Sequence, residues 1–546
     1  MANSLQNVNT IQLEKVQNLK ELTERAAHLW GDKVGLIFDE FNEKLTYNEI
    51  NEKSNLIAKA LQNVGVKAKD RVAIMLRNRS EFPLTWLAIG KIGAIMVPIN
   101  IYYKEFDAKY LLEHSEANVV VSSSEFIPLL KTIQTSLPTL KTIIAVDDNS
   151  YPDVVFLEEM ISKIDNKDPL ANPVYPETIM NIQYTSGTTG RPKGCMLTHN
   201  YWMNFARKNV LLPYPKINNN DVLMTAQPFY YMDPQWNVIT SLASGGTLVV
   251  LDRFHPSTFW DKVREHKVTF FYCLGIMPIL MLKMPKSPLD RENSVRHIAC
   301  SAIPVHLHKE LEDRWGAPWF EAFGMTETGS DIGVTKEEHD SLVGTGCIGR
   351  PNPYREAKIV DENDQTLPRG EVGELVIRGH GMMEGYYKNP EATKEVFRNG
   401  YFHTGDLAYM TEEGLIYYIG RKKEMIRRSG ENISATEVEE VIKLYPSVKY
   451  VGVVPVPDEL RGEEVKAYVV LQDGEVGDTK QVKNLLGFSK ERLAYFKIPR
   501  YWEFRSDLPR TPSERVAKQV LRDEKSDLRL DSYDSVENVW RTKDND

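Results

Sequence analysis

Cysteine is scarce in this chain and follows no metal or redox pattern. The 546 residues include four cysteines, at positions 195, 273, 300 and 347. None forms a Cys-x-x-Cys pair, so neither a zinc ribbon nor a dithiol redox motif is indicated. The pattern suits a reducing compartment.

Long apolar runs and a basic excess are also missing. The most apolar stretch, Leu84 to Ile99, contains Lys91 and several turn formers, and no stretch approaches the about 20 apolar residues of a membrane span. The first 30 residues are polar and have no apolar signal core, so we expect a cytoplasmic protein. A net charge of −9 argues against broad nucleic-acid binding, which needs a basic face.

The residues that are present predict a large α/β protein of at least two domains. A single domain rarely exceeds about 300 residues, and strand-like and helix-like segments alternate through most of the chain. Thr46 and Glu49 stand in capping-box spacing before a helix predicted to Val64. Strands are expected at 71–76, 119–122, 180–183, 246–251, 268–272, 450–456 and 467–471, and a helix at 257–266.

The composition of the sequence changes after Gly420. Four charged residues, 421–424, separate the α/β region from a shorter segment with its own strands. We therefore expect a domain of residues 1–422 and a second of residues 423–546. The last 20 residues are highly charged and suggest a loose tail, although Trp540 could anchor them.

A phosphate-binding loop is the strongest chemical signal. Residues 184–194 read Tyr-Thr-Ser-Gly-Thr-Thr-Gly-Arg-Pro-Lys-Gly. Glycines allow backbone N–H groups to turn towards an anion, hydroxyls add donors, and Lys193 supplies a mobile positive charge. The Gly-x4-Gly-Lys-Ser/Thr spacing of nucleotide hydrolases is absent. The expected phosphate contacts are Thr185, Ser186, Gly187, Thr188, Thr189, Gly190 and Lys193.

This loop resembles the signature of the adenylate-forming superfamily, which includes acyl-CoA synthetases, luciferases and peptide-synthetase adenylation domains. The resemblance runs, with several motifs in order, from about residue 20 to about residue 520. It implies a large N-terminal domain of layered α/β sheets with a β-barrel-like subdomain, and a small mobile α+β C-terminal domain. It also implies ATP, Mg²⁺ and coenzyme A as cofactors or co-substrates.

A second motif, Phe323-Gly-Met-Thr-Glu-Thr328, resembles the family segment that holds adenine and magnesium. The resemblance implies that Phe323 packs on adenine, that Thr326 contacts phosphate and that Glu327 is a catalytic ligand of Mg²⁺. A carboxylate completed by water suits that ion. Gly324, Met325, Ser301 and Ala302 are assigned to the nucleotide site on the same basis.

Two further motifs complete the predicted nucleotide site. Asp406, in Tyr-Phe-His-Thr-Gly-Asp, matches the family's ribose-binding aspartate, and Arg421 is expected on the ribose side of the nucleotide. By resemblance Lys423 is the hinge between the domains, and the loop around Gly430 lines the tunnel for the pantetheine arm of coenzyme A.

The chain departs from the family pattern near its C-terminus. Where Thr-Pro-Ser-Gly-Lys is usual, Glu514 replaces the glycine and Arg515 the catalytic lysine. The planar guanidinium of Arg515 is not equivalent to a point charge, and Lys518, three residues on, is the alternative. Tyr231 also stands where a histidine is usual, so gating of the acyl site by a different ring is expected.

The segment Phe229 to Trp236 resembles the acyl-pocket stretch of the superfamily and contains an unusual acid, Asp233. With Tyr230, Tyr231 and Trp236 it suits a cationic head such as a quaternary ammonium, and the chain looks most like the crotonobetaine/carnitine-CoA ligase branch. The alternative is that Asp233 caps a turn before Pro234 and faces solvent.

Two other patterns are not expected to bind ligands. Gly344 to Gly349 fits Gly-x-Gly-x-x-Gly, but no clear strand precedes it and no helix follows, so dinucleotide binding is not indicated. His306 and His308 flank Leu307 without a third ligand nearby in sequence, so a metal site is not expected.

The motifs together predict an ATP-dependent ligase that activates a small carboxylic acid as an acyl-AMP and transfers it to coenzyme A. Two alternatives remain open at this point: transfer to a carrier protein or another acceptor, and a non-catalytic binding protein, suggested only by Glu514 and Arg515. The sequence assigns neither the acid nor an oligomeric state.

Overall fold

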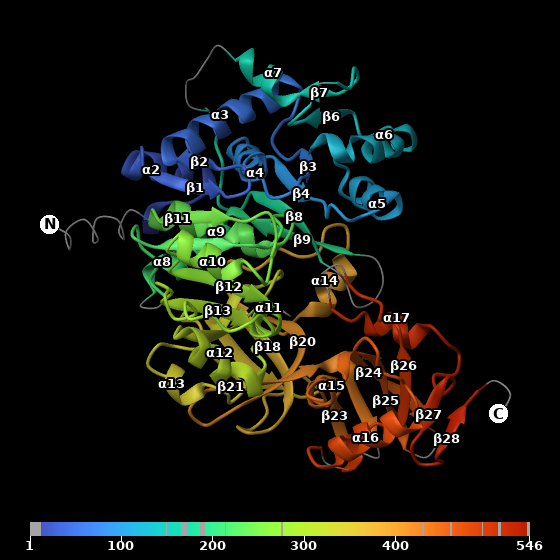
Figure 1. Cartoon of the computed structure of the whole chain (residues 1–546). Helices are drawn as coiled ribbons and strands as arrows, with labels where there is room; N and C mark the ends of the chain where they lie inside the picture. Colours follow the sequence, from blue (N-terminus) through green and yellow to red (C-terminus); the bar gives the residue numbers. More distant parts are fainter. Residues whose placement is uncertain are drawn as a thin grey trace.

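The chain folds into three β-sheets with helices packed on them. The computed structural model describes residues 13–148, 150–164, 170, 172–185, 192–212, 215–274, 277–428, 431–458, 461–493, 495–511 and 515–542. Figure 1 shows the first two sheets in the large blue-to-yellow part of the molecule and the third in the smaller orange-to-red part.

The first sheet is a layer of seven strands in the order β7-β6-β5-β3-β4-β8-β9, parallel except for the final pair. Its central strands are buried, as is usual for parallel strands covered by helices. The strands are β3 (Arg71–Met75), β4 (Ile95–Pro98), β5 (Val119–Ser122), β6 (Thr142–Ala145), β7 (Val155–Phe156), β8 (Ile179–Thr185) and β9 (Lys193–Thr198). The helices of this region are α2 (Leu19–Trp30), α3 (Tyr47–Asn63), α4 (Glu81–Lys91), α5 (Glu105–Ser115), η1 (Ser124–Phe126), α6 (Ile127–Ser136) and α7 (Leu157–Ser162).

The second sheet has fourteen strands and joins a parallel half to an antiparallel half. The order is β17-β18-β20-β21-β16-β15-β14-β13-β12-β10-β11-β1-β2, with β19 beside β20. The half from β14 to β1 is parallel and consists of β1 (Val34–Phe38), β10 (Val222–Thr225), β11 (Thr247–Val250), β12 (Phe270–Leu274), β13 (His297–Ser301) and β14 (Trp319–Met325), with β2 (Glu43–Thr46) antiparallel at its edge. The helices are α8 (His199–Leu211), α9 (Met232–Ser244), α10 (Phe259–Glu265), α11 (Met277–Leu282), η2 (Val305–Leu307), α12 (His308–Trp315), α13 (His339–Leu342) and α14 (Pro390–Val396).

The antiparallel half occupies the place of the expected barrel-like subdomain. It contains β15 (Gly329–Gly333), β16 (Cys347–Pro351), β17 (Arg355–Val360), β18 (Gly373–Gly379), β19 (Phe397–Arg398), β20 (Tyr401–Met410) and β21 (Ile416–Arg421). Among the described residues these strands form an open path from β17 to β15, although β16 and β17 lie in contact. The expected barrel is therefore an unclosed sheet.

The third sheet belongs to the C-terminal region and shares no strand with the other two among the described residues. It is built from β22 (Met425–Arg428), β23 (Glu431–Ser434), β24 (Val448–Asp458), β25 (Gly462–Leu471), β26 (Tyr501–Arg505), β27 (Ser532–Asp534) and β28 (Val539–Arg541). Its helices are α15 (Ala435–Lys443), α16 (Thr479–Lys490), η4 (Tyr495–Lys497) and α17 (Lys518–Asp523). The chain passes from β21 to β22 through η3 (Lys422–Glu424), where the domain boundary is predicted.

The local predictions from the sequence are largely confirmed. Helix α3 begins after Thr46, whose side chain accepts from the N–H of Glu49 while Glu49 accepts from the N–H of Thr46. The strands expected at 71–76 and 119–122 are β3 and β5. The helix expected at 257–266 is the shorter α10, because residues 255–258 form a turn instead.

The chain end is less loose than its charge suggests. Strands β27 and β28 extend the third sheet beyond β26. Trp540 packs against Tyr533, with ring centroids 5.4 Å apart, and its indole N–H donates to Thr479 at 3.0 Å. The described tail is thus anchored by Trp540.

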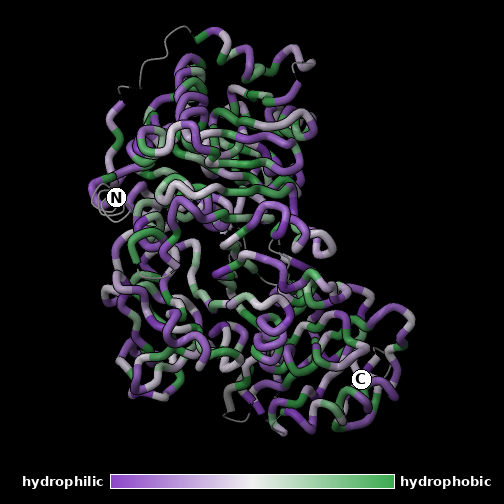
Figure 2. Tube along the Cα trace, turned by 60° about the vertical axis from the view of Figure 1, so that its left-hand side comes forward, coloured by the Kyte–Doolittle hydropathy of each residue, from purple (hydrophilic) through white to green (hydrophobic). Residues whose placement is uncertain are grey.

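Apolar residues (green) are interspersed with hydrophilic ones (purple) along the chain in Figure 2, and the buried apolar residues form the core. The largest buried cluster combines residues of the first sheet, α2, α3, α4, α8 and α9, and so holds the first two sheets together. No helix in the described part of the chain is both long and apolar enough to cross a membrane.

Candidate active site

Three segments that are far apart in sequence meet at Tyr386. Lys193, the first residue of β9, places its ammonium nitrogen 5.0 Å from the centre of the Tyr386 ring. The Tyr386 hydroxyl donates to Glu327 Oε1 at 3.0 Å, and the backbone of Tyr386 pairs with Cys195 of β9. The predicted phosphate lysine and the predicted metal ligand are therefore held on two sides of one aromatic ring.

The turn that carries Glu327 is closed by backbone contacts. Residues 326–328 connect β14 to β15, and the N–H of Thr328 donates to the carbonyl of Met325 at 3.2 Å. A Cβ at Gly324 would lie 2.0 Å from the carbonyl oxygen of Gly329, so this strand pairing requires glycine there. The carbonyl of Glu327 accepts from the N–H of Met383, which fixes the turn against the segment before Tyr386.

Asp406 presents a buried carboxylate on β20. It is 1% exposed, and burial raises its pKa to about 6, although the charge of Arg421 acts in the opposite direction. Arg421 Nε lies 3.0 Å from Asp406 Oδ1, and a side-chain hydrogen bond with Tyr418 also lowers the pKa of this carboxyl. Each carboxylate oxygen has more than one lone pair, so the buried acid can still accept from ligand hydroxyls.

Arg515 and Lys518 occupy different environments. Arg515 is exposed, and its positive charge is close enough to Asp406 to lower the pKa of that carboxyl. Lys518 lies 2.6 Å from Glu424 and 3.0 Å from Glu439. Burial lowers the pKa of Lys518, but these two carboxylates outweigh it and raise the pKa above its usual value. Arg515 thus acts electrostatically on Asp406, whereas Lys518 is paired with two carboxylates of the C-terminal region.

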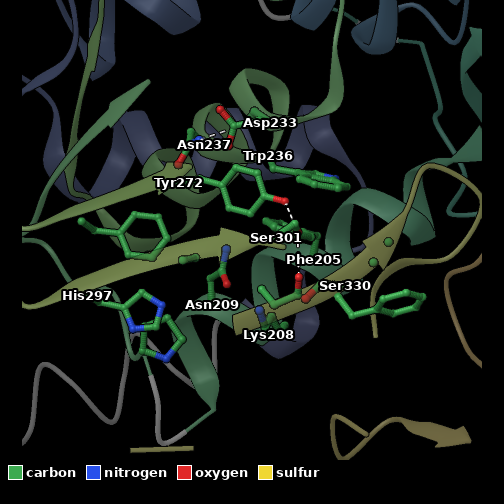
Figure 3. A pocket seen from close by; sticks show the side chains of 17 residues that line it. Phe205, Lys208, Asn209, Asp233, Trp236, Asn237, Tyr272, His297, Ser301 and Ser330 are labelled. Atoms are coloured by element: carbon green, nitrogen blue, oxygen red, sulfur yellow. Dashed lines mark hydrogen bonds between the residues drawn. The ribbon is translucent and has the colours of Figure 1, made fainter. Parts of the chain in front are cut away.

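A pocket lies between α8, α9 and the parallel strands β12, β13 and β14 (Figure 3). The Phe205 and Trp236 rings stack 4.8 Å apart on one wall. The Tyr272 hydroxyl lies 2.5 Å from Ser301 Oγ, which itself donates to the carbonyl of Ala322 at 2.7 Å. The pocket also reaches Phe323 and Gly324 of the predicted adenine segment, so it opens towards the nucleotide site.

Asp233 lines this pocket and does not face solvent. It lies in the first turn of α9 and is 5% exposed. Its carboxylate accepts from Thr225 Oγ1 at 2.8 Å and from Asn237 Nδ2 at 3.0 Å. Burial raises its pKa to about 7, against the effect of these hydrogen bonds. The alternative that Asp233 is a solvent-facing turn cap is therefore wrong.

Tyr230 and Tyr231 lie next to the pocket but are not among its lining residues. Their rings are 4.8 Å apart, and Tyr231 precedes the first residue of α9. Asn100 Nδ2 lies 3.4 Å from the Tyr231 hydroxyl, and Gln183 Nε2 donates to the carbonyl of Tyr230 at 2.8 Å. Their expected role in gating stays a prediction.

The remaining predicted residues fall into two groups. Phe323 faces Tyr418 with ring centroids 6.4 Å apart, and Ala302 adopts a left-handed backbone conformation directly after β13. Thr185, Met325 and Thr326 are partly buried at the ends of β8 and β14. Ser186, Gly187, Thr188, Thr189, Gly190 and Gly430 lie outside the described residues, as does the side chain of Lys423.

His308 belongs to a cluster that sequence spacing does not reveal. Glu312 and His339 join it, with His339 Nε2 2.8 Å and His308 Nε2 3.6 Å from Glu312 Oε1, while His306 does not take part. The N–H of Gly344 donates to His308 Nδ1, so Nε2 carries the proton and donates to the carbonyl of Trp319. A protonated nitrogen such as Nε2 of His308 offers no lone pair to a metal. We therefore interpret the cluster as a structural hydrogen-bond network.

Two residues of the site were not predicted from the sequence, Tyr386 and Lys208. Tyr386 stands in an ordinary Gly-Tyr-Tyr segment, and only its partners Lys193 and Glu327 distinguish it. Lys208 follows Arg207 on α8, and its place in the pocket depends on how α8 packs against the sheet.

Comparison with known proteins places this site in a family. The family model "AMP-binding enzyme" matches residues 23–387, and "AMP-binding enzyme C-terminal domain" matches residues 437–515. The chain is 32% identical over 525 residues to a crotonobetaine/carnitine–CoA ligase of Citrobacter koseri, covering 93% of this chain and 99% of that protein. The Salmonella typhimurium ligase of the same name is also 32% identical, over 518 residues.

Solved structures agree with this fold. The o-succinylbenzoate CoA synthetase of Bacillus subtilis, in complex with its acyl-adenylate intermediate, has a TM-score of 0.81 at 27% identity and covers 93% of this chain and 98% of its own. ATP-bound MatB from Rhodopseudomonas palustris has a TM-score of 0.81 at 27% identity, covering 94% of this chain and 100% of its own.

The chain belongs to the AMP-binding family of adenylate-forming enzymes. Within it, the protein is an AMP-forming acyl-CoA ligase: it uses ATP to convert a carboxylic acid to an acyl-adenylate and transfers the acyl group to coenzyme A. The predictions of the fold class and of the reaction type are confirmed.

The contact between Tyr386 and Glu327 yields a first prediction. Tyr386→Phe keeps the ring beside Lys193 but removes the hydroxyl that orients Glu327. Hydrogen bonds to charged groups contribute about 1.5–3 kcal/mol, so acid-dependent ATP–pyrophosphate exchange should fall roughly tenfold or more. Tyr387→Phe, which removes a hydroxyl bonded to Glu116 at the surface, is the control. Equal exchange rates in the two variants would contradict the role of Tyr386.

Proposed function

We propose that Lys193, Glu327, Asp406, Arg421 and Arg515 form the ATP site of this ligase. The single observation that supports this most is Asp406, whose buried carboxylate pairs with Arg421 and keeps acceptor lone pairs for a ligand. The two hydroxyls of a ribose would satisfy them. Lys193 enters from β9, next to the loop that is predicted to hold the phosphates.

Glu327 fits the expected magnesium ligand. Its carboxylate is buried in the turn after β14, and the hydrogen bond from Tyr386 uses Oε1. Magnesium typically takes one or two protein carboxylates together with water and substrate phosphates. When bound, the ion would neutralise charge on the leaving pyrophosphate.

The proposed mechanism relies on position and charge. The substrate carboxylate attacks the α-phosphorus of ATP, and the bond to pyrophosphate breaks. Lys193 and Arg515 lie on the side where negative charge develops and stabilise it. In the second half-reaction the coenzyme A thiolate attacks the acyl carbonyl, and AMP leaves. The pocket walls hold the acyl group away from water in both steps.

We assign the adenylation cation to Arg515 rather than to Lys518. Arg515 lowers the pKa of Asp406 from an exposed position, while both carboxylates beside Lys518 already neutralise it. Lys518 instead fixes the start of α17 against Glu424, the residue after the predicted hinge.

The assignment predicts a ranking of two variants. Arg515→Ala should lower the single-turnover rate of acyl-AMP formation about 10²-fold, as loss of one preorganised charge contact often does. Lys518→Ala should have a smaller effect on this rate but should lower the unfolding temperature, because it leaves Glu424 and Glu439 unpaired. The reverse ranking of the two rates would reassign the catalytic role to Lys518.

We propose that residues 1–422 and 423–546 move as two bodies about Lys423. Support comes from the sheet topology, in which β21 and β22 belong to different sheets and only η3 connects them. Rotation at such a connection lets one site serve both half-reactions.

Restricting Lys423 tests this motion. Lys423→Pro fixes φ at this position, whereas Lys423→Ala removes the same side chain and leaves φ free. Acyl-AMP formation should be similar in both variants, and thioester formation should fall far more in Lys423→Pro. If both half-reactions fall equally in Lys423→Pro, rotation at Lys423 is not required.

We propose that the acid carries a quaternary ammonium group, as in carnitine-type acids. The relatives at 32% identity are named for such substrates. The pocket supports the same class, because a carboxylate, Asp233, lies beside the stacked rings of Phe205 and Trp236. Aromatic faces and one acid attract a cation that keeps its apolar methyl surface.

An isosteric pair of acids tests the cationic head. γ-Butyrobetaine ends in a trimethylammonium group. 5,5-Dimethylhexanoate has the same shape, with a neutral carbon in place of the quaternary nitrogen. The wild type should prefer γ-butyrobetaine in kcat/KM for AMP release, and Asp233→Asn should reduce the preference about tenfold. Since burial raises the pKa of Asp233 to about 7, the preference should grow as pH rises through 7 and the carboxyl ionises. An unchanged preference in Asp233→Asn would contradict the proposal.

The four cysteines are buried and unpaired. This supports a reducing compartment, and we propose the cytoplasm, where ATP and coenzyme A are both available.

A further inference from the structure

We propose that Lys208 recognises a second oxygen acceptor on the acid, a hydroxyl or a carboxylate carried by the acyl chain. The acid would then be one with a polar acyl chain rather than a simple fatty acid. This inference deepens the proposed function, because it rests on the pocket of Figure 3 being the site of the acid.

Lys208 is a cation without a partner of its own. It extends from α8 into the pocket wall and is partly buried. Among the described residues its ammonium group makes no hydrogen bond and no ion pair, and its one ring contact, with Phe205, spans 5.9 Å. An ammonium has three donors, and leaving them unmet away from water is unfavourable.

The acidic side chain that acts electrostatically on Lys208, Asp331, is already paired with another residue. Asp331 raises the pKa of Lys208, which burial lowers to about 8. Its carboxylate, however, is buried against Arg355, whose Nε lies 2.7 Å from Oδ1, and it also accepts from Thr328. Asp331 is therefore paired with Arg355 in the core, and no ion pair between Asp331 and Lys208 is present among the described residues.

Several other polar groups in and around the pocket already have partners. Thr225 and Asn237 donate to Asp233, and Asn209 Nδ2 donates to Thr240. Ser301 bonds Tyr272 and the carbonyl of Ala322. Lys208 thus remains the strongest donor that a ligand in this pocket would meet.

The imidazole beside Lys208 does not compete for an anion. His297 is stacked between Phe270 and Phe320, with centroids 5.2 and 4.5 Å away. Burial holds its pKa well below the usual value, and the charges of Lys208 and Arg296 act in the same direction. His297 is therefore neutral, and Lys208 carries the positive charge of this wall.

Lys208 and Asp233 lie on opposite sides of the pocket. In Figure 3 Asp233 is at the top of the view and Lys208 at the bottom, with Tyr272, Ser301 and Asn209 between them. A cationic group on the acid would therefore be recognised by Asp233 at one side of the pocket, and an oxygen acceptor by Lys208 at the other. A methylene chain against Lys208 would remove water from an ammonium without replacing its hydrogen bonds.

Matched pairs of acids test the proposal directly. Butyrate, 3-hydroxybutyrate and succinate compare a chain without an acceptor, with a hydroxyl and with a carboxylate. γ-Butyrobetaine and carnitine make the hydroxyl comparison in the presence of the ammonium. The measurement is kcat/KM for AMP release and for thioester formation in the wild type, Lys208→Met and Lys208→Arg.

The wild type should favour the acceptor-bearing member of at least one pair by tenfold or more. Lys208→Met should remove that preference, Lys208→Arg should retain part of it, and the exposed-site control Lys283→Met should not change it. The preference should also fade as pH rises through 8, where Lys208 loses its charge while Asp331 and Arg355 remain paired.

The outcomes separate this inference from the proposed function. A preference among the three acids without an ammonium group (butyrate, 3-hydroxybutyrate and succinate) that depends on Lys208, with no turnover of γ-butyrobetaine or carnitine, would support Lys208 and contradict the ammonium pocket. The same preference in the wild type and in Lys208→Met would overturn the role of Lys208, whichever acids react. If the wild type prefers succinate but not 3-hydroxybutyrate over butyrate, and Lys208→Met removes that preference, the acceptor is a second carboxylate.

Discussion

The hydrogen bond between Tyr386 and Glu327 is the contact on which the catalytic geometry depends. It joins the turn after β14 to the segment that follows β18, and the ring of the same tyrosine lies beside Lys193 of β9. Strand β9 belongs to the first sheet and β14 to the second. One side chain thus fixes the lysine of one sheet relative to the acid of the other, and a shift between the sheets would separate them.

Local structure and the nucleotide motifs could be predicted from the sequence because short patterns encode them. Thr46 and Glu49 cap α3 through contacts three residues apart, and Phe323 to Thr328 is one continuous segment formed by the end of β14 and the turn after it. The reaction type followed from these motifs and the resemblance they carry. The domain boundary near Lys423 was marked by a run of charge, and the sheets change there.

Features that depend on packing across the fold could not be predicted in this way. The interpretation of Asp233 required knowing that Thr225, from a different strand, donates to it inside a pocket. Lys208 looks like a solvated residue of an amphipathic helix until α8 is packed against the second sheet. The His308 cluster combines α12, α13 and β14, which no local spacing reveals. In each case the decisive partner is remote in sequence.

The separate third sheet has a consequence for how such ligases diversify. The described strands of residues 425–541 pair only with one another and with no strand of the large domain. Across the junction, the Ser434 hydroxyl donates to the carbonyl of Ile419, a bond that any short polar side chain at this position would replace. The C-terminal unit is therefore built as an exchangeable module. Recombination near residue 423 would join the acid pocket of one relative to the thioester machinery of another without breaking a strand pair.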